Sequence, residues 1–455
     1  MTLDQKHWQD RLSVLADKHG VPGAQFALLQ GDEVVDVAHG VLNIRTGAPA
    51  STDALFQIGS ISKVWTATLV MKLVEEGLVD LDEPVVTYLP DFKVADADVT
   101  QRVTTRHLLA HTSGIDGDLF LDTGRGDDAV EKYVEACANL KQNHPLGATM
   151  SYCNSGYTVL GRLIEVLRGK TWDAVLREQL FTPLGLTSAG TLPEEALLYA
   201  AACGHITPPG GELMVTPQWG IYRSTGPAGL IHATARQTLA FAKLHLDGGV
   251  APDGTRVLSE ESAAAMRVPQ VEVPDPYTLG SHWGLGWILM RWSDREVFGH
   301  DGATLGQGGF MRIVADAGVG LCLLVNGGHG RDLYEDLFRE ALSELCGVDM
   351  PARLEPPAEP AQVDLSAYTG KYVREGVEMD ITEGDGGRLA LRMRNTSALA
   401  VGDPDGEGTT IALVPLEPDL FVGRQSEDDS WTPAVFFELD GGRYLHFGAR
   451  ATPKV

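Results

Sequence analysis

The chain has 455 residues, of which 44% are hydrophobic and 22% are charged, and its formal net charge is −26. This composition excludes a disordered, fibrous or coiled-coil chain, and the length suits one large domain plus a small one. So strong a negative charge repels phosphate backbones and anionic lipid headgroups, so we expect no nucleic-acid partner and no membrane partner.

The predicted elements begin with an amphipathic helix over residues 6–19. Alternating residues over 23–44 then predict a hairpin that turns at Gly31-Asp32. A helix over 62–76 follows and ends before Gly77. Further helices are predicted over 104–110, 128–141, 155–168, 171–180, 234–246 and 259–267.

Strands return near the end of this region, over 285–290, 295–300, 308–314 and 319–325, before a helix over 332–347. The order of strands, helices, strands and helix predicts an α+β fold, in which both chain ends build an antiparallel sheet flanked by helices around a helical subdomain. Residues 350–363 form a Pro-rich linker. Short alternating runs over 364–455 predict a small β-barrel, which leaves 1–349 as the other domain.

The N-terminus is charged and lacks the apolar core of a signal peptide, and no run of about 18 apolar residues follows. The scattered cysteines contain no CxxC pair, which fits reduced thiols and gives no zinc-site pattern. We therefore expect a cytoplasmic protein without a metal or other cofactor. The cysteines are Cys137, Cys153, Cys203, Cys322 and Cys346.

Three polar groups can carry chemistry, and the first is Ser60 with Lys63 in GSISK. These residues share one face of a predicted helix N-terminus, where a lysine in apolar surroundings has a lowered pKa and can activate a serine hydroxyl. The alternative is that Ser60 or Ser62 caps the helix while Lys63 lies in solvent.

The second group is Tyr152 with Asn154, on alternate positions before a predicted helix. A tyrosine there can relay protons and an asparagine can hold a substrate amide. A buried tyrosine and an Asx turn at Asn154 are the alternative. The third group is His300-Asp301-Gly302, where Gly302 lets a ligand approach the backbone; the alternative is a hairpin turn.

The order S-x-x-K, Y-x-N, H-x-G resembles the serine β-lactamase and penicillin-binding-protein superfamily. Phrases such as LLAHTSGI and WGLGW are also similar to that family, and the resemblance covers residues 5 to 347. It implies that Ser60 is the acylated nucleophile, Lys63 its general base, Tyr152 the proton relay and Asn154 the holder of the substrate amide.

The resemblance also implies an oxyanion hole made by the backbone N–H groups of Ser60 and Ala303. His300 stands where β-lactamases usually keep a lysine, and no residue matches a deacylating glutamate. Both departures count against a β-lactamase. They make the chain more similar to the family's esterases, D-amino-acid peptidases and peptide-cyclising thioesterases.

The added β module resembles the stand-alone thioesterases that release and head-to-tail cyclise nonribosomal peptides. That resemblance implies a peptide or peptidyl-thioester substrate, a possible carrier protein, and Arg450 as the residue that orients the peptide; a surface arginine is the alternative. An esterase or D-amino-acid peptidase remains the alternative function, ahead of a β-lactamase or a non-catalytic acyl sensor. The Gly- and Asp-rich segment 114–128 is a candidate rim for carrier docking.

Five other side chains need an assignment. His107 and His111 have a spacing that can hold a metal on a helix, but no third ligand is evident and packing beneath the site is favoured. Trp219 is a candidate to line the substrate pocket, as are Trp283 and Trp287, and ordinary core positions are the alternative for all three.

Overall fold

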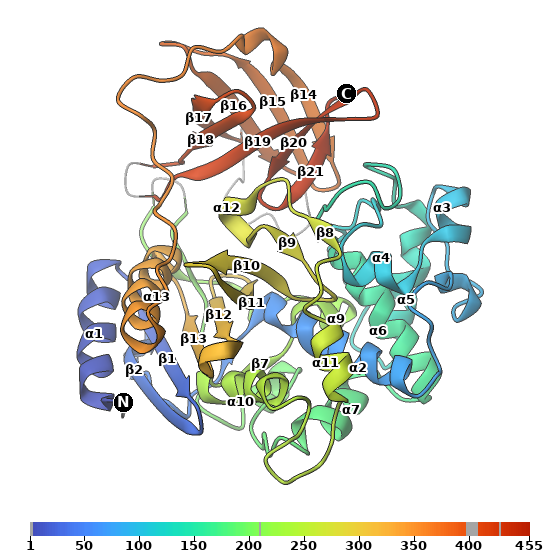
Figure 1. The fold of residues 1–455 in the computed structure, drawn as a ribbon, viewed down its shortest axis with the longest axis vertical. Helices are drawn as coiled ribbons and strands as arrows, with labels where there is room; N and C mark the ends of the chain where they lie inside the picture. Colours follow the sequence, from blue (N-terminus) through green and yellow to red (C-terminus); the bar gives the residue numbers. More distant parts are fainter. Residues whose placement is uncertain (1–2, 209–210, 397–407, 427–428) are drawn as a thin grey trace.

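The chain folds into a helix-flanked antiparallel sheet followed by a small barrel of strands, as Figure 1 shows. The computed structural model describes residues 3–208, 211–396, 408–426 and 429–455. The predicted α+β class and the predicted C-terminal barrel are both confirmed.

The large sheet has nine strands in the order β3-β2-β1-β13-β12-β11-β10-β9-β8. Strand β1 pairs with β2 on one side and with β13 on the other, so both chain ends build the sheet as predicted. The strands are β1 (Gly23–Gln30), β2 (Glu33–Asn43), β3 (Ala48–Pro49), β8 (Val271–Glu272), β9 (His282–Trp283), β10 (Ile288–Trp292), β11 (Arg295–Ala303), β12 (Gly308–Val314) and β13 (Val319–Val325).

Each face of this sheet packs on its own helices because successive side chains of a strand point to opposite faces. Phe26 and Leu28 of β1 share a core with α1 (Gln5–Lys18) and α13 (Gly330–Cys346). Ala27 and Leu29 point the other way, into a core with α2 (Ser62–Glu75) and α10 (Ala235–Leu246). The sheet is therefore buried on both faces, and α2 is held beneath its centre.

The helical subdomain lies between β4 and β9 in the chain (Figure 1). Its helices are α3 (Ala97–Arg102), α4 (Thr105–Leu109), α5 (Ala129–Ala136), α6 (Asn154–Arg168), α7 (Trp172–Leu176), α8 (Pro193–Ala196), α9 (Gly226–Gly229), α11 (Glu260–Ala265) and α12 (Pro276–Leu279). Two short strand pairs join β4 (Phe56–Gln57) to β7 (His232–Ala233) and β5 (His205–Ile206) to β6 (Met214–Val215).

Two predicted elements are displaced. The helix predicted over 128–141 ends at Ala136 and continues as a 3₁₀ turn over Cys137–Asn139. The strand predicted over 285–290 begins only at Ile288, because the WGLGW segment turns at Gly286, where φ is +96°. Only glycine adopts such a φ without strain, so the turn follows from that residue.

The barrel has eight strands in sequence order, and a bridge between Tyr372 of the first strand and Lys454 nearly closes it. Tyr372, Phe421, Phe436 and Leu445 fill its interior. The strands are β14 (Gly370–Arg374), β15 (Val377–Glu383), β16 (Leu389–Asn395), β17 (Thr409–Glu417), β18 (Leu420–Gly423), β19 (Thr432–Leu439), β20 (Gly442–Phe447) and β21 (Arg450–Pro453).

The segment over 351–363 contains neither helix nor strand, and the division into domains over 1–349 and 364–455 remains a prediction. Among the described residues, no helix combines the length and the apolar character needed to cross a membrane.

Candidate active site

Ser60 and Lys63 lie at the start of α2, directly beneath β11. Ser60 belongs to the 3₁₀ turn Gly59–Ile61, and Lys63 lies in the first turn of α2. The alternative that Ser60 or Ser62 caps the helix is wrong, because no side chain caps this helix and Ser62 Oγ accepts from the Ile231 N–H. Lys63 is fully buried, so it does not lie in solvent either.

The amine of Lys63 has three polar neighbours. Nζ lies 3.1 Å from Ser60 Oγ, 2.8 Å from Asn154 Oδ1 and 2.6 Å from the Ala228 carbonyl oxygen. A neutral amine has two hydrogens and one lone pair. Because the amide and carbonyl oxygens can only accept, they take both hydrogens and leave the lone pair for the Ser60 hydroxyl.

The environment of Lys63 favours this neutral form. Burial holds the pKa of Lys63 well below its usual value, and the charge of Arg450 lowers it further, against the opposing charge of Asp118. Among the described residues, no carboxylate contacts the amine directly: the oxygens hydrogen-bonded to it belong to a hydroxyl, an amide and a backbone carbonyl. Lys63 can therefore take a proton from Ser60.

Tyr152 lies across the site from Lys63. Lys63 Nζ is 4.9 Å from the centre of its ring, and His111 stacks on the ring at 4.2 Å. Burial raises the pKa of Tyr152 above its ordinary value, which the nearby Ser60 hydroxyl only partly opposes. The Tyr152 hydroxyl has no hydrogen-bond partner within the described residues, so it is free to exchange a proton with a bound substrate.

His300 lies inside β11, so the hairpin-turn alternative for His300-Asp301-Gly302 is wrong. These residues pair with Met311, Phe310 and Gly309 of β12. His300 Nδ1 is 2.5 Å from the Asp301 carbonyl oxygen; that oxygen only accepts, so Nδ1 carries the hydrogen and Nε2 is an acceptor. Burial lowers the pKa of His300 to about 3, so the ring is neutral and supplies no cation for a carboxylate.

The backbone of β11 lies directly on the Ser60 turn. A Cβ on Gly59 would lie 2.5 Å from the Ala303 nitrogen, and a Cβ on Gly302 would lie 1.9 Å from the Ile58 carbonyl oxygen. Two glycines thus permit contact between the turn and the strand. The backbone nitrogens of Ser60 and Ala303 are brought together, as a pair of oxyanion donors requires.

Replacing Gly302 with alanine is expected to lower kcat/KM by about 10²–10³-fold, because the added methyl group must push β11 away from Ser60 and weaken one oxyanion donor. The rate of Ser60 acylation measures the effect. Gly442→Ala is the control, since its Cβ would meet only ordinary contacts at 3.5 Å. Equal rates for the Gly302 variant and the wild type would contradict the oxyanion assignment.

The predicted residues surround one cavity of about 600 Å³. Its lining includes Ser60, Tyr152, Asn154, His300, Gly302, Ala303 and Arg450. Trp219 is not among the lining residues; its indole donates to the Ala202 carbonyl oxygen. Trp283 and Trp287 are fully buried core residues, and the edge of Trp283 packs against His300.

The histidine pair has no shared role. His107 takes part in the capping box at the start of α4. His111 is buried and its Nδ1 accepts from the Cys153 N–H, so it holds the extended segment that presents Tyr152. The sequence favoured histidines that pack beneath the site, and His111 has this position.

The buried carboxylate of Asp118 joins the barrel to the catalytic groups, and it was missed in the sequence. It accepts from Asn154 Nδ2 at 2.8 Å, from Arg374 at 2.7 Å, and from two nitrogens of Arg450 at 2.9 Å each. Burial raises the pKa of Asp118, but the charges of Arg450 and Arg374 outweigh this and bring it to about 2. Asp118 fixes the Asn154 amide so that its oxygen faces Lys63.

The turn between β20 and β21 also contacts the site. The Tyr152 N–H donates to the Ala449 carbonyl oxygen, and the Arg450 guanidinium lies 4.9 Å from the centre of the Tyr152 ring. Arg450 is therefore not a surface arginine. Within the proposed rim over 114–128, Asp116 and Asp118 are buried against the barrel, so this part of the segment is not open to a carrier.

Comparison with known proteins identifies the family. A family model described as Beta-lactamase matches residues 8–344. Penicillin-binding protein 4 of Amycolatopsis lactamdurans is 48% identical over 378 residues, which cover 83% of this chain and 99% of that protein.

Two solved structures are also similar. SurE has 28% identity and a TM-score of 0.75 over 99% of both chains, and it has been solved with D-Leu as well. The D-amino acid amidase of Ochrobactrum anthropi SV3 has 25% identity and a TM-score of 0.60, over 74% of this chain and 99% of that one. The chain belongs to the β-lactamase family, as its resemblance predicted, and is a serine hydrolase with that fold.

Proposed function

We propose that this protein transfers acyl groups through an ester on Ser60, and that it releases and head-to-tail cyclises nonribosomal peptides. The observation that carries the acyl-transfer step is the buried amine of Lys63, whose two hydrogens face oxygen acceptors while its lone pair faces the Ser60 hydroxyl. A neutral base in contact with a serine is the arrangement that nucleophilic catalysis needs.

The reaction divides into two balanced steps. Ser60 Oγ attacks the thioester carbonyl, Lys63 takes the hydroxyl proton, and the thiol leaves with a proton supplied through Tyr152. The N-terminal amine of the same peptide then attacks the Ser60 ester. The amine loses one proton to the Tyr152–Lys63 pair, the C–O bond to Ser60 breaks, and Ser60 recovers its hydroxyl hydrogen.

One feature favours cyclisation over hydrolysis, and a second disfavours a β-lactam substrate. The β20–β21 turn lies over Tyr152 with Arg450, so the site is partly covered from water. Neutral His300 leaves this position of the cavity without the lysine cation that would favour a β-lactam carboxylate. The likeness to SurE, solved with D-Leu, supports a D-residue at the acyl carbon.

A simple esterase or D-amino-acid peptidase is the second candidate. The likeness to a D-amino acid amidase favours it, since that enzyme shares the fold over 74% of this chain. A carrier protein as the acyl donor and a cytoplasmic location both belong to the cyclase proposal, because a carrier-bound peptide is made inside the cell.

Incubation with a peptidyl thioester that ends in a D-residue tests the proposal. We expect mass spectrometry to find a transient acyl adduct on the Ser60 peptide, followed by a cyclic product that lacks one water relative to the linear acid. Ser60→Ala, which removes only the nucleophile, is expected to form neither adduct nor ring.

The products distinguish the candidates. Linear acid alone would indicate a hydrolase. An adduct that forms once and persists would indicate an acyl sensor. An adduct on another residue, or full activity of Ser60→Ala, would refute the acyl-transfer proposal.

A further inference from the structure

A second cavity, of about 900 Å³, lies between the catalytic part and the barrel. One wall comes from α12, β10 and the start of α13, and the other from the barrel strands β17 to β20. The linker residues from Pro351 to Glu355 complete it. We call this cavity the interdomain chamber. Its lining contains none of the residues that carry the proposed chemistry.

The interdomain chamber adjoins the cavity at Ser60. Thr278, Gly328, Gly330 and Arg331 line both. Arg331 is anchored at this junction: its Nη2 donates to the Thr278 carbonyl oxygen at 3.0 Å, and its Nη1 lies 3.6 Å from Asp301, the neighbour of His300. A ligand bound at Ser60 therefore has a route into the chamber past Arg331.

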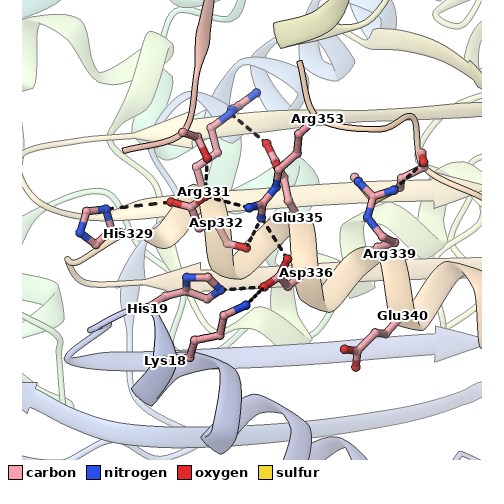
Figure 2. Close-up of polar contacts among 12 residues, drawn as sticks. Lys18, His19, His329, Arg331, Asp332, Glu335, Asp336, Arg339, Glu340 and Arg353 are labelled. Atoms are coloured by element: carbon pink, nitrogen blue, oxygen red, sulfur yellow. Dashed lines mark hydrogen bonds and ion pairs between the residues drawn. The ribbon is translucent and has the colours of Figure 1, made fainter. Parts of the chain in front are cut away.

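Polar contacts hold the linker on α13, as Figure 2 shows. Arg353 of the linker forms ion pairs with Asp332, Glu335 and Asp336 of α13. Arg339 donates to the carbonyl oxygens of Met350 and Pro351. These contacts hold the linker on α13, so this wall of the cavity between the catalytic part and the barrel has a fixed shape.

Barrel residues close the other side of the chamber. Ser430 donates to Asp332, and His329 lies 3.6 Å from Asp429. Both contacts join the start of α13 to the segment before β19. The chamber therefore keeps its shape only while the barrel stays docked.

The lining offers surface for the side chains and the backbone carbonyl groups of a peptide. Tyr277, Trp292, Trp431 and Phe447 offer aromatic surface, and the Tyr277 side chain is about half exposed to the chamber and solvent. Of the residues that the structure describes, six arginines and four carboxylates line the chamber, and Arg353 is paired with Asp332 and Glu335. Arg331, with ion pairs of 3.6 and 3.7 Å, can still donate to a peptide carbonyl.

The size of the cavity at Ser60 determines how many residues of an acyl chain it holds before the chain enters the chamber. A roughly spherical cavity of 600 Å³ is about 10 Å across, and an extended peptide rises ~3.3–3.6 Å per residue, so the peptide leaves this cavity after about three residues. Together the two cavities exceed the ~300–1,000 Å³ of an ordinary small-molecule site. A longer acyl chain would use both.

We propose that the interdomain chamber binds the part of the peptidyl acyl chain beyond the first three or so residues from Ser60, with Arg331 donating to its backbone carbonyls at the junction. This inference rests on the proposed acyl transfer and names its substrate class: peptides with apolar or aromatic side chains, too long for the catalytic cavity alone.

Two thioesters of the same small thiol test it, one with a dipeptidyl and one with an octapeptidyl acyl group, both ending in the same D-residue. The octapeptide is expected to have a higher kcat/KM for Ser60 acylation. Tyr277→Ala, which removes aromatic surface, and Ala352→Trp, which fills the chamber from the linker, should each lower the octapeptide value about tenfold relative to the dipeptide value.

Leu197→Ala is the control: Leu197 is 83% exposed and lines neither cavity. If both thioesters acylate Ser60 with equal kcat/KM, or the chamber variants affect both lengths alike, the chamber is not an acyl subsite and the proposed function stands. If neither thioester acylates Ser60, the proposed function itself fails. Circular dichroism of each variant checks that the barrel remains folded.

Discussion

Replacing Lys63 with methionine is expected to slow acylation of Ser60 by about 10²–10⁴-fold, the usual contribution of a general base. Methionine has nearly the same length and tolerates the buried position, so the amine is the main group removed. The rate of adduct formation with a peptidyl thioester measures the loss.

The pH dependence of kcat/KM tests the role of Lys63 independently. Lys63 must be neutral to act, and its pKa lies well below the ordinary lysine value, so wild-type kcat/KM should rise with pH through a limb well below pH 10.5. The Lys63→Met variant should lack that limb. Lys72→Met is the control, since Lys72 lies on the same helix and donates to the Val257 carbonyl oxygen away from the cavity. If the Lys63→Met variant kept the wild-type rate and the wild-type rise of kcat/KM with pH, Lys63 would not be the general base.

Asp118→Ala should have the largest effect on stability, about 3–5 kcal/mol, because it leaves Arg374 and Arg450 buried without their carboxylate. Calorimetry measures the loss, since a chain of two parts need not unfold in one step. The folded pKa of Asp118, about 2, lies below the unfolded value of 3.8. The ionised carboxylate therefore stabilises the fold fully above about pH 4, and this contribution is lost as pH falls towards 2.

The Asp118→Asn variant separates the effect of Asp118 on the pKa of Lys63 from its effect on the stability of the fold. It keeps a side chain of the same size but removes the negative charge that raises the pKa of Lys63. The acidic limb of kcat/KM should therefore move to lower pH, which a partly unfolded enzyme would not produce. Glu178→Ala, from an exposed pair with Lys170, should cost at most about 1 kcal/mol. An unmoved limb with normal stability would show that Asp118 does not position the site.

Much of the architecture could be predicted because it depends on local patterns. The alternating residues and the glycine in the turn after β1 determine the β1–β2 hairpin, whichever strand pairs with β1 later. The order of elements then requires both chain ends to share one sheet. Ser60, Tyr152, Asn154 and His300 belong to short motifs and line one cavity, and Lys63 lies behind it in contact with Ser60 and Asn154.

What the sequence could not reveal depends on contacts between distant segments. Asp118 has no local pattern, and its partners Arg374 and Arg450 lie in the other part of the chain. Asp301-Gly302 has the composition of a turn, but pairing with β12 keeps it extended. Trp219 fits a pocket by type alone, whereas its position depends on the Ala202 carbonyl oxygen.

The pairing of β1 with β13 has a consequence for synthesis of the protein. The two strands are separated by roughly 300 residues, and a ribosome adds about 5–20 residues per second, so β1 waits roughly 15–60 s for its partner. During this time one edge of the β1–β2 hairpin is unpaired, and such edges recruit other strands. The nascent chain should therefore depend on chaperones until α13 emerges, whereas the barrel, made last from neighbouring strands, can fold at once.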